Sequence, residues 1–140
     1  MTSEKVFIID SDSAQLKLIR DEIDHFLRDQ HFPDKAREDI LVAMGEATAN
    51  SIRHAYENKP GHEVRVTIED YPEKVVFRVR DYGKKINPAK LKETPTLPPV
   101  EPHGLGIYFM KTIMDDLTYN TSHAKGNEVI LTKFKEKNNH

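Results

Sequence analysis

Hydrophobic and polar residues follow two different periods along this chain, and these periods predict where its helices and strands lie. Apolar residues at spacings of three and four indicate amphipathic helices, whereas alternation indicates half-buried strands. The helical period covers residues 13–30, 34–56 and 104–117. Short apolar or alternating runs predict strands at residues 6–9, 63–69, 74–81, 117–121 and 128–134.

Clusters of polar and turn residues separate these elements. Residues 10–13 are of the kinds that end strands and cap helices, and Asp34 is placed to cap the second helix. Turns at residues 70–73 and 125–127 predict two antiparallel hairpins. The order β-α-α-β-β-loop-α-β-β therefore predicts a two-layer α/β sandwich (α+β), with the helices on one face of a mostly antiparallel sheet.

One stretch follows neither period. The 20 residues between Gly83 and Gly104 contain five of the eight prolines of the chain. Loops of this length are uncommon in small domains unless they are functional or mobile. We therefore expect a functional or mobile loop here.

Composition limits the classes of protein that this chain can be. Its 140 residues fit one domain, and Leu, Ile, Val and Phe make up a quarter of them, enough to form a core. The absence of cysteine excludes disulfides, iron–sulfur clusters, cysteine-bound zinc and a cysteine nucleophile. We expect a single domain over residues 1–140.

Charge and hydropathy narrow the expected partners and location. With 21 basic and 23 acidic side chains, the net charge is −2, so there is no general electrostatic reason to bind nucleic acid or an anionic membrane. No apolar run approaches the ~20 residues that span a bilayer, and the first residues do not resemble a signal peptide. We expect a cytoplasmic protein that binds neither nucleic acid directly nor membrane.

Three polar features stand out from this scaffold. Glu46, Asn50 and His54 are spaced to line one side of the second predicted helix, where small neighbours would allow a ligand to approach. Asp81 and Gly83 follow an alternating strand. Taken alone, the helical spacing also fits a solvated polar stripe, and the Asp-x-Gly pair fits an ordinary turn.

The third feature is a pair of glycines, Gly104 and Gly106, that opens the last predicted helix after the long loop. Glycine allows close approach of the backbone to a ligand, and the free N–H groups at a helix N-terminus favour phosphate. A flexible hinge before the helix explains the same residues.

In this order, the three features resemble the N, G1 and G2 boxes of the GHKL superfamily of ATPases, which includes DNA gyrase and histidine kinases. Within it, the chain most resembles the anti-sigma factor serine/threonine-protein kinases. Their N box reads Glu-Ala-x-x-Asn-Ala-x-x-His-Ala-Tyr, and residues 46–56 follow it with Ser51 in place of Ala. The resemblance implies the Bergerat ATP-binding fold, with a mixed, mostly antiparallel sheet.

The resemblance also implies a role for each matching residue. Asn50 would coordinate Mg²⁺, and Glu46 would be the general base that accepts the proton of an attacking hydroxyl. Asp81 would accept a hydrogen bond from the adenine amino group, and Gly83 would let the backbone pass beside the base.

The remaining matches concern the phosphates of ATP. Gly104, Leu105 and Gly106 would present backbone amides to them, and residues 84–103 would form the ATP lid. His54 would either bind near the phosphates or pack at the helix end. Lys85 stands where the G1 box often has a second glycine, so we expect it to reshape the root of the lid.

The implied function is phosphorylation by ATP of a serine or threonine in a STAS-domain anti-sigma factor antagonist, with a sigma factor as the competing ligand. The implied assembly is a homodimer. An alternative is a binding module that uses ATP to sequester a partner without phosphorylating it, although this leaves Glu46 without a task. A histidine kinase would need a phospho-accepting helical hairpin upstream of the first strand, which we do not expect here.

Overall fold

The computed structural model describes residues 2–86, 108, 110–120 and 122–135. Its strands are β1 (Ser3–Asp10), β2 (Glu63–Asp70), β3 (Lys74–Asp81), β4 (Asp116–Asn120) and β5 (Glu128–Phe134). Its two longer helices are α1 (Leu16–Asp29) and α2 (Asp34–Asn50). A 3₁₀ turn, η1 (Ser13–Gln15), precedes α1, and a π-helical turn, η2 (Ser51–Ala55), follows α2. Residues 108 and 110–113 are also helical.

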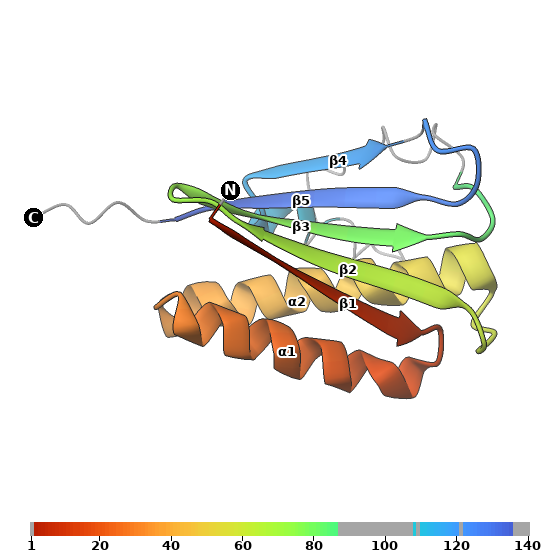
Figure 1. The fold of residues 1–140 in the computed structure, drawn as a ribbon, viewed down its shortest axis with the longest axis horizontal. Helices are drawn as coiled ribbons and strands as arrows, with labels where there is room; N and C mark the ends of the chain where they lie inside the picture. The colour runs from red at the N-terminus through yellow and green to blue at the C-terminus, as the bar shows by residue number, and fades with distance from the viewer. Residues whose placement is uncertain (1, 87–107, 109, 121, 136–140) are drawn as a thin grey trace, which may run out of the picture.

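The five strands form one sheet in the order β1-β2-β3-β5-β4 (Figure 1). All four pairings among these strands are antiparallel, so the expectation of a mixed sheet is wrong for the described part of the chain. The chain does cross over between β3 and β4, but β5 lies between these two strands and pairs antiparallel with both. The two-layer architecture is confirmed.

The core fills the space between the sheet and the two long helices, which cover the same face of it (Figure 1). Residues of β2 alternate between half-buried and buried, as a sheet with one covered face requires. The predicted apolar stripe of α1 faces the core: Ile19, Ile23, Phe26 and Leu27 are buried, and Leu16 is partly buried and packs against them. No helix among the described residues is long and apolar enough to cross a membrane.

Polar residues at the end of β1 form hydrogen bonds to the turn that precedes β2. The fully buried Ser11 hydroxyl donates to the Lys59 carbonyl at 2.6 Å and accepts from the His62 amide at 3.1 Å. The Asp10 carboxylate accepts from the Gly61 amide at 3.0 Å. These bonds fix the turn between η2 and β2 beside the end of β1, and so hold the end of the second helix in place.

The second helix differs from its prediction. A single helix over residues 34–56 is expected from its apolar spacing, but the α-helical pattern stops at Asn50 and continues as the π turn η2. A π turn contains more residues than an α turn, so side chains after Asn50 point in directions that α-helical spacing does not predict. Such turns occur often at functional sites.

Two leucines on α1 test the location of the core. Leu27 is fully buried and Leu18 is 55% exposed. We expect Leu27→Ala to lower the free energy of unfolding by about 2–5 kcal/mol, because it leaves a cavity. Leu18→Ala, the matched control, should change it by less than about 0.5 kcal/mol. Urea denaturation followed by circular dichroism measures both, and equal losses would contradict this placement of α1.

Candidate functional site

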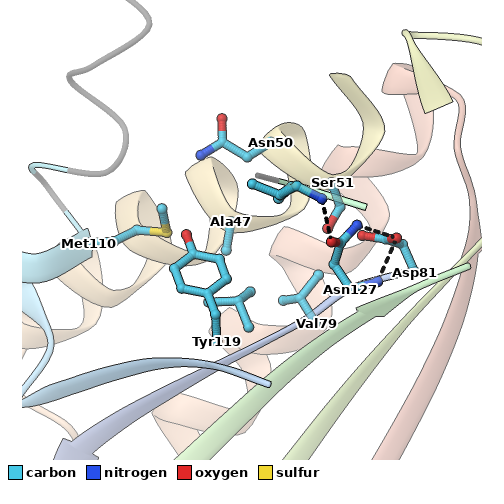
Figure 2. Close-up of a pocket in the computed structure, with 10 residues that line it drawn as sticks. Ala47, Asn50, Ser51, Val79, Asp81, Met110, Tyr119 and Asn127 are labelled. Atoms are coloured by element: carbon cyan, nitrogen blue, oxygen red, sulfur yellow. Dashed lines mark hydrogen bonds between the residues drawn. The ribbon is translucent and has the colours of Figure 1, made fainter. Parts of the chain in front are cut away.

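The site is organised around Asp81, the last residue of β3, whose side chain is only 1% exposed. Its Oδ1 atom accepts three hydrogen bonds. The donors are the Gly83 amide at 3.2 Å, the Asn127 amide at 3.1 Å and the Asn127 side-chain Nδ2 at 3.0 Å. Figure 2 shows the two bonds from Asn127. The turn after β3 and the residue just before β5 thus hold this carboxylate in one orientation.

The second carboxylate oxygen of Asp81 has no such partners. Oδ2 is buried and has no hydrogen bond within the part of the chain that the structure describes. Burial raises the pKa of Asp81 above its ordinary value, while the hydrogen bonds from Asn127 and Gly83 and the nearby Ser51 hydroxyl act in the opposite direction. A buried acceptor without a donor is costly unless a ligand supplies one. An amino group such as that of adenine would satisfy it.

Asp81 lies on the wall of a pocket between α2 and the sheet (Figure 2). Most of the pocket wall is apolar, which suits a flat aromatic base, and its polar groups come from a few side chains. Burial raises the pKa of Tyr119, so its phenol is neutral at physiological pH. The described residues that line the pocket are Ala47, Asn50, Ser51, Val79, Asp81, Ile86, Met110, Tyr119, Asn127 and Val129.

Asn127 is a site residue that the sequence analysis missed. Besides its bonds to Asp81, its Nδ2 donates to the Lys84 carbonyl at 2.8 Å and its Oδ1 accepts from the Ile86 amide at 2.8 Å. One side chain therefore ties the segment after β3 to Asp81. In the sequence, Gly126-Asn127 is an ordinary turn pair, and no signal distinguishes it from other turns.

Two glycines allow backbone segments to pack closely against each other around Asp81. A Cβ atom on Gly83 would lie 2.3 Å from the Ala55 carbonyl oxygen and 2.8 Å from the Tyr56 ring. Gly83 is thus required for packing against the end of η2, and its predicted position beside the base stays a prediction. Gly126 has a φ of +78°, and a Cβ atom there would lie 2.1 Å from the Asp81 carbonyl oxygen.

The three polar residues of the second helix lie in different environments. Asn50 is 8% exposed and lines the pocket, where its Oδ1 accepts a hydrogen bond from the Arg53 guanidinium. The Glu46 side chain is partly exposed and has no hydrogen bond or ion pair among the described residues. His54 is exposed on η2 and is not one of the described lining residues of the pocket. The expected common stripe therefore does not extend past Asn50.

The other predicted contacts lie outside the described residues. These are Gly104, Leu105 and Gly106, together with residues 87–103 of the expected lid. Lys85 is exposed in the described segment before them. The phosphate-binding roles of the two glycines and of Leu105 stay predictions.

The residues present fit a magnesium ion that arrives with a nucleotide. No group of three or more His, Asp or Glu side chains in the described ranges could hold a metal ion. Mg²⁺ needs only one or two protein oxygens when phosphates and waters complete its coordination. Asn50 offers one such oxygen at the pocket, and the unpaired Asp81 Oδ2 fits the base of the same nucleotide.

A mostly apolar pocket, a buried acceptor without a partner among the described residues and a neighbouring amide oxygen, on a two-layer α+β fold, are features expected of a nucleotide-binding domain. Comparison with known families agrees. The family model of the histidine kinase-like ATPase domain matches residues 9–133, and the chain belongs to this family. Membership of this family implies ATP binding.

Individual relatives show which members of this family the chain is similar to. The serine-protein kinase RsbW of Listeria innocua is 30% identical over 112 residues, which cover 74% of this chain and 69% of that protein. The anti-sigma F factor of Clostridium botulinum is 33% identical over 98 residues, 68% of each chain. The serine-protein kinase RsbW of Bacillus mycoides is 33% identical over 104 residues, 69% of this chain and 63% of that protein. The resemblance to anti-sigma factor kinases is confirmed.

Gly83→Ala tests the close packing of the site. We expect it to lower the free energy of unfolding by about 1–3 kcal/mol, because the added methyl group meets backbone atoms of Ala55 that cannot move independently. Gly45→Ala on α2 is the control. Nothing lies within 4 Å of its added Cβ, so it should stabilise by about 0.5–1 kcal/mol. Chemical denaturation measures both, and a neutral Gly83→Ala would contradict the packing.

Asp81→Asn tests the raised pKa. Because the folded protein binds the Asp81 proton more tightly than the unfolded chain does, stability should fall as pH rises from 3.8 through the raised pKa. The free energy of unfolding of the variant should lack this pH-dependent contribution. The difference between the two pH profiles of the free energy of unfolding isolates it from other carboxylates. A difference that grows in the opposite direction, or none, would show that burial does not control this group.

Proposed function

We propose that this protein is an ATP- and magnesium-dependent serine/threonine protein kinase of the anti-sigma factor type. It phosphorylates a STAS-domain anti-sigma factor antagonist and regulates transcription by partner switching. The observation that carries the proposal is the Glu46 carboxylate, which has no hydrogen bond or ion pair with any other described residue and lies one helical turn before Asn50 of the pocket. Relatives named serine-protein kinase support the reaction, and a relative named anti-sigma F factor supports the regulatory role.

The adenine end of the site supplies binding and selectivity. The buried Asp81 Oδ2 accepts a hydrogen bond from the amino group of adenine. Guanine presents a carbonyl oxygen at the equivalent position, which would repel the carboxylate. Apolar residues such as Ala47 and Val79 contact the faces of the base and exclude water.

The phosphate end supplies the chemistry. Asn50 Oδ1 is the protein ligand of magnesium, which neutralises charge on the transferring phosphoryl group when it is bound with ATP. Glu46 accepts the proton of the substrate serine hydroxyl through one of its carboxylate oxygens. The serine oxygen forms a bond to the γ-phosphorus, the bond from this phosphorus to the β–γ bridging oxygen breaks, and ADP leaves.

The expected partners follow from the relatives and the family resemblance. A STAS-domain antagonist provides the phosphorylated residue, and a sigma factor competes with it for the kinase. The proposal includes a cytoplasmic location and a homodimer, and light scattering of the purified protein measures the latter. We also propose that His54, which is exposed on η2, contacts the phosphates when ATP is bound.

Glu46→Gln tests the catalytic role. We expect the transfer of labelled γ-phosphate to a STAS protein from the same organism to fall by roughly 10²–10⁴-fold, because the amide cannot accept the proton. ATP affinity, measured by calorimetry, should stay within about threefold. Glu38→Gln is the matched control, because Glu38 is an exposed residue of the same helix.

Two results would overturn the kinase proposal. One is the absence of transfer by the native protein with each STAS protein of the source organism. The other is undiminished transfer by Glu46→Gln. A native protein that binds ATP and holds its partner equally long with ATP and with a non-hydrolysable analogue would instead be a sequestering module.

A further inference from the structure

The floor of the pocket contains a row of three residues that neighbour one another across the sheet. Tyr119 of β4 is paired with Val129 of β5, and Val129 is paired with Val79 of β3. Asp81 lies two residues after Val79 in β3, so both side chains point to the same face of the sheet. All four residues line the pocket. Tyr119 and Asp81 are therefore at opposite ends of this floor, with apolar side chains between them.

A bound adenine nucleotide would extend from one end of this floor toward the other. By the usual spacings of a sheet, the Cα atoms of Tyr119 and Asp81 are roughly 12 Å apart. The amino group and the sugar are attached at opposite ends of the purine, so a base held by its amino group directs its sugar away from Asp81. Figure 2 shows the Tyr119 hydroxyl pointing toward α2, across the pocket from Asp81. This hydroxyl is on the side to which the sugar extends.

The Tyr119 hydroxyl has no hydrogen bond to any other residue that the structure describes. Burial raises the pKa of Tyr119, and no bond within the described ranges offsets this effect. Tyr56 gives the contrast, because its hydroxyl donates to the Glu63 carbonyl and accepts from the Tyr82 amide. Tyrosine hydroxyls that are removed from water usually find such a partner. The Tyr119 hydroxyl therefore indicates that a partner is missing from the pocket.

The other polar side chains of the described lining already have a partner or an assigned role. Asn127 uses both polar atoms of its side chain in bonds within the protein, and the Ser51 hydroxyl bonds to Asp81. The proposed function assigns Asp81 Oδ2 to the adenine amino group and Asn50 Oδ1 to magnesium. Among the described lining residues, Tyr119 is the polar side chain that remains. The ribose hydroxyls are polar groups of ATP that this assignment leaves without a protein partner.

We propose that Tyr119 is a specificity-determining residue that recognises the sugar of the nucleotide. Its phenol donates a hydrogen bond to a ribose hydroxyl oxygen, and its ring packs against the sugar. This inference rests on the proposed function, because it takes the ligand to be ATP with its amino group at Asp81. It goes beyond that function by assigning the sugar contact to β4, a strand that none of the three sequence boxes includes.

The test removes a hydroxyl from each side of this contact in turn. Calorimetry measures the affinities of the purified protein for the magnesium complexes of ATP, 2′-deoxy-ATP and 3′-deoxy-ATP. We expect the native protein to bind one deoxy analogue roughly 3- to 10-fold more weakly than ATP, the usual effect of losing one neutral hydrogen bond. Tyr119→Phe should bind ATP more weakly by a similar factor, and should bind ATP and that analogue with affinities within about twofold of each other. The analogue that shows this pattern identifies the ribose hydroxyl that is bound.

Tyr71→Phe is the matched control. Tyr71 is also partly buried, but it lies in the turn between β2 and β3, at the end of β3 opposite to Asp81. Its hydroxyl donates to Glu69 Oε1 at 3.4 Å, and neither residue belongs to the described lining of the pocket. This variant should keep both the ATP affinity of the native protein and its preference for ATP over the deoxy analogue.

Two results would overturn the inference and leave the proposed function intact. Equal binding of ATP and both deoxy analogues by the native protein would show that no ribose hydroxyl is recognised. An undiminished preference for ATP in Tyr119→Phe would show that another residue makes the contact, and a uniform loss of affinity for all three ligands in this variant would show a structural role only. A native protein that binds no ATP would overturn both the inference and the proposed function.

Discussion

The arrangement of the site depends on how one buried carboxylate is satisfied. Burying the charged form of Asp81 costs free energy, and three donors on Oδ1 offset part of that cost. They come from the turn after β3 and from Asn127, so the carboxylate joins two segments that are far apart in the chain. Because all three donors reach the same oxygen, Oδ2 has no hydrogen-bond partner among the described residues. The orientation of the acceptor is thus built into the fold before any nucleotide binds.

The hydrogen bonds to Asp81 Oδ1 require close approach of the neighbouring backbone segments. The donors can reach Oδ1 only if the backbone comes very close at both ends, and this is where Gly83 and Gly126 lie. The same approach places the Lys84 amide 2.9 Å from the Ala55 carbonyl, so the end of η2 is tied to the turn after β3. Tyr56 completes the junction by donating to the Glu63 carbonyl and accepting from the Tyr82 amide. The position of the second helix and the position of Asp81 are therefore coupled.

Most of the fold could be predicted from the sequence, because each element has a clear period and a polar boundary. Ile19, Ile23 and Phe26 identify the buried face of α1, and both hairpins follow from alternation. The π turn could not be predicted, since its apolar residues, Ile52 and Ala55, continue a helical spacing. Asn127 was missed for a different reason: its function depends on contacts with residues more than 40 positions away, which a local turn pattern does not contain.

The two ends of the pocket differ in how firmly their polar groups are held. At the Asp81 end, Asp81 and Asn127 bond to each other and to backbone amides, and the proposed adenine contact at Oδ2 would break none of these bonds. At the Asn50 end, the Arg53 guanidinium bonds to the side-chain oxygen that the proposed function assigns to magnesium. Selectivity for the base needs a fixed acceptor, whereas phosphoryl transfer needs groups that respond to charge as ATP enters and ADP leaves. Under the proposed function, the firmly bonded Asp81 end would meet the first requirement and the Asn50 end the second, at the point where the helix changes from α to π.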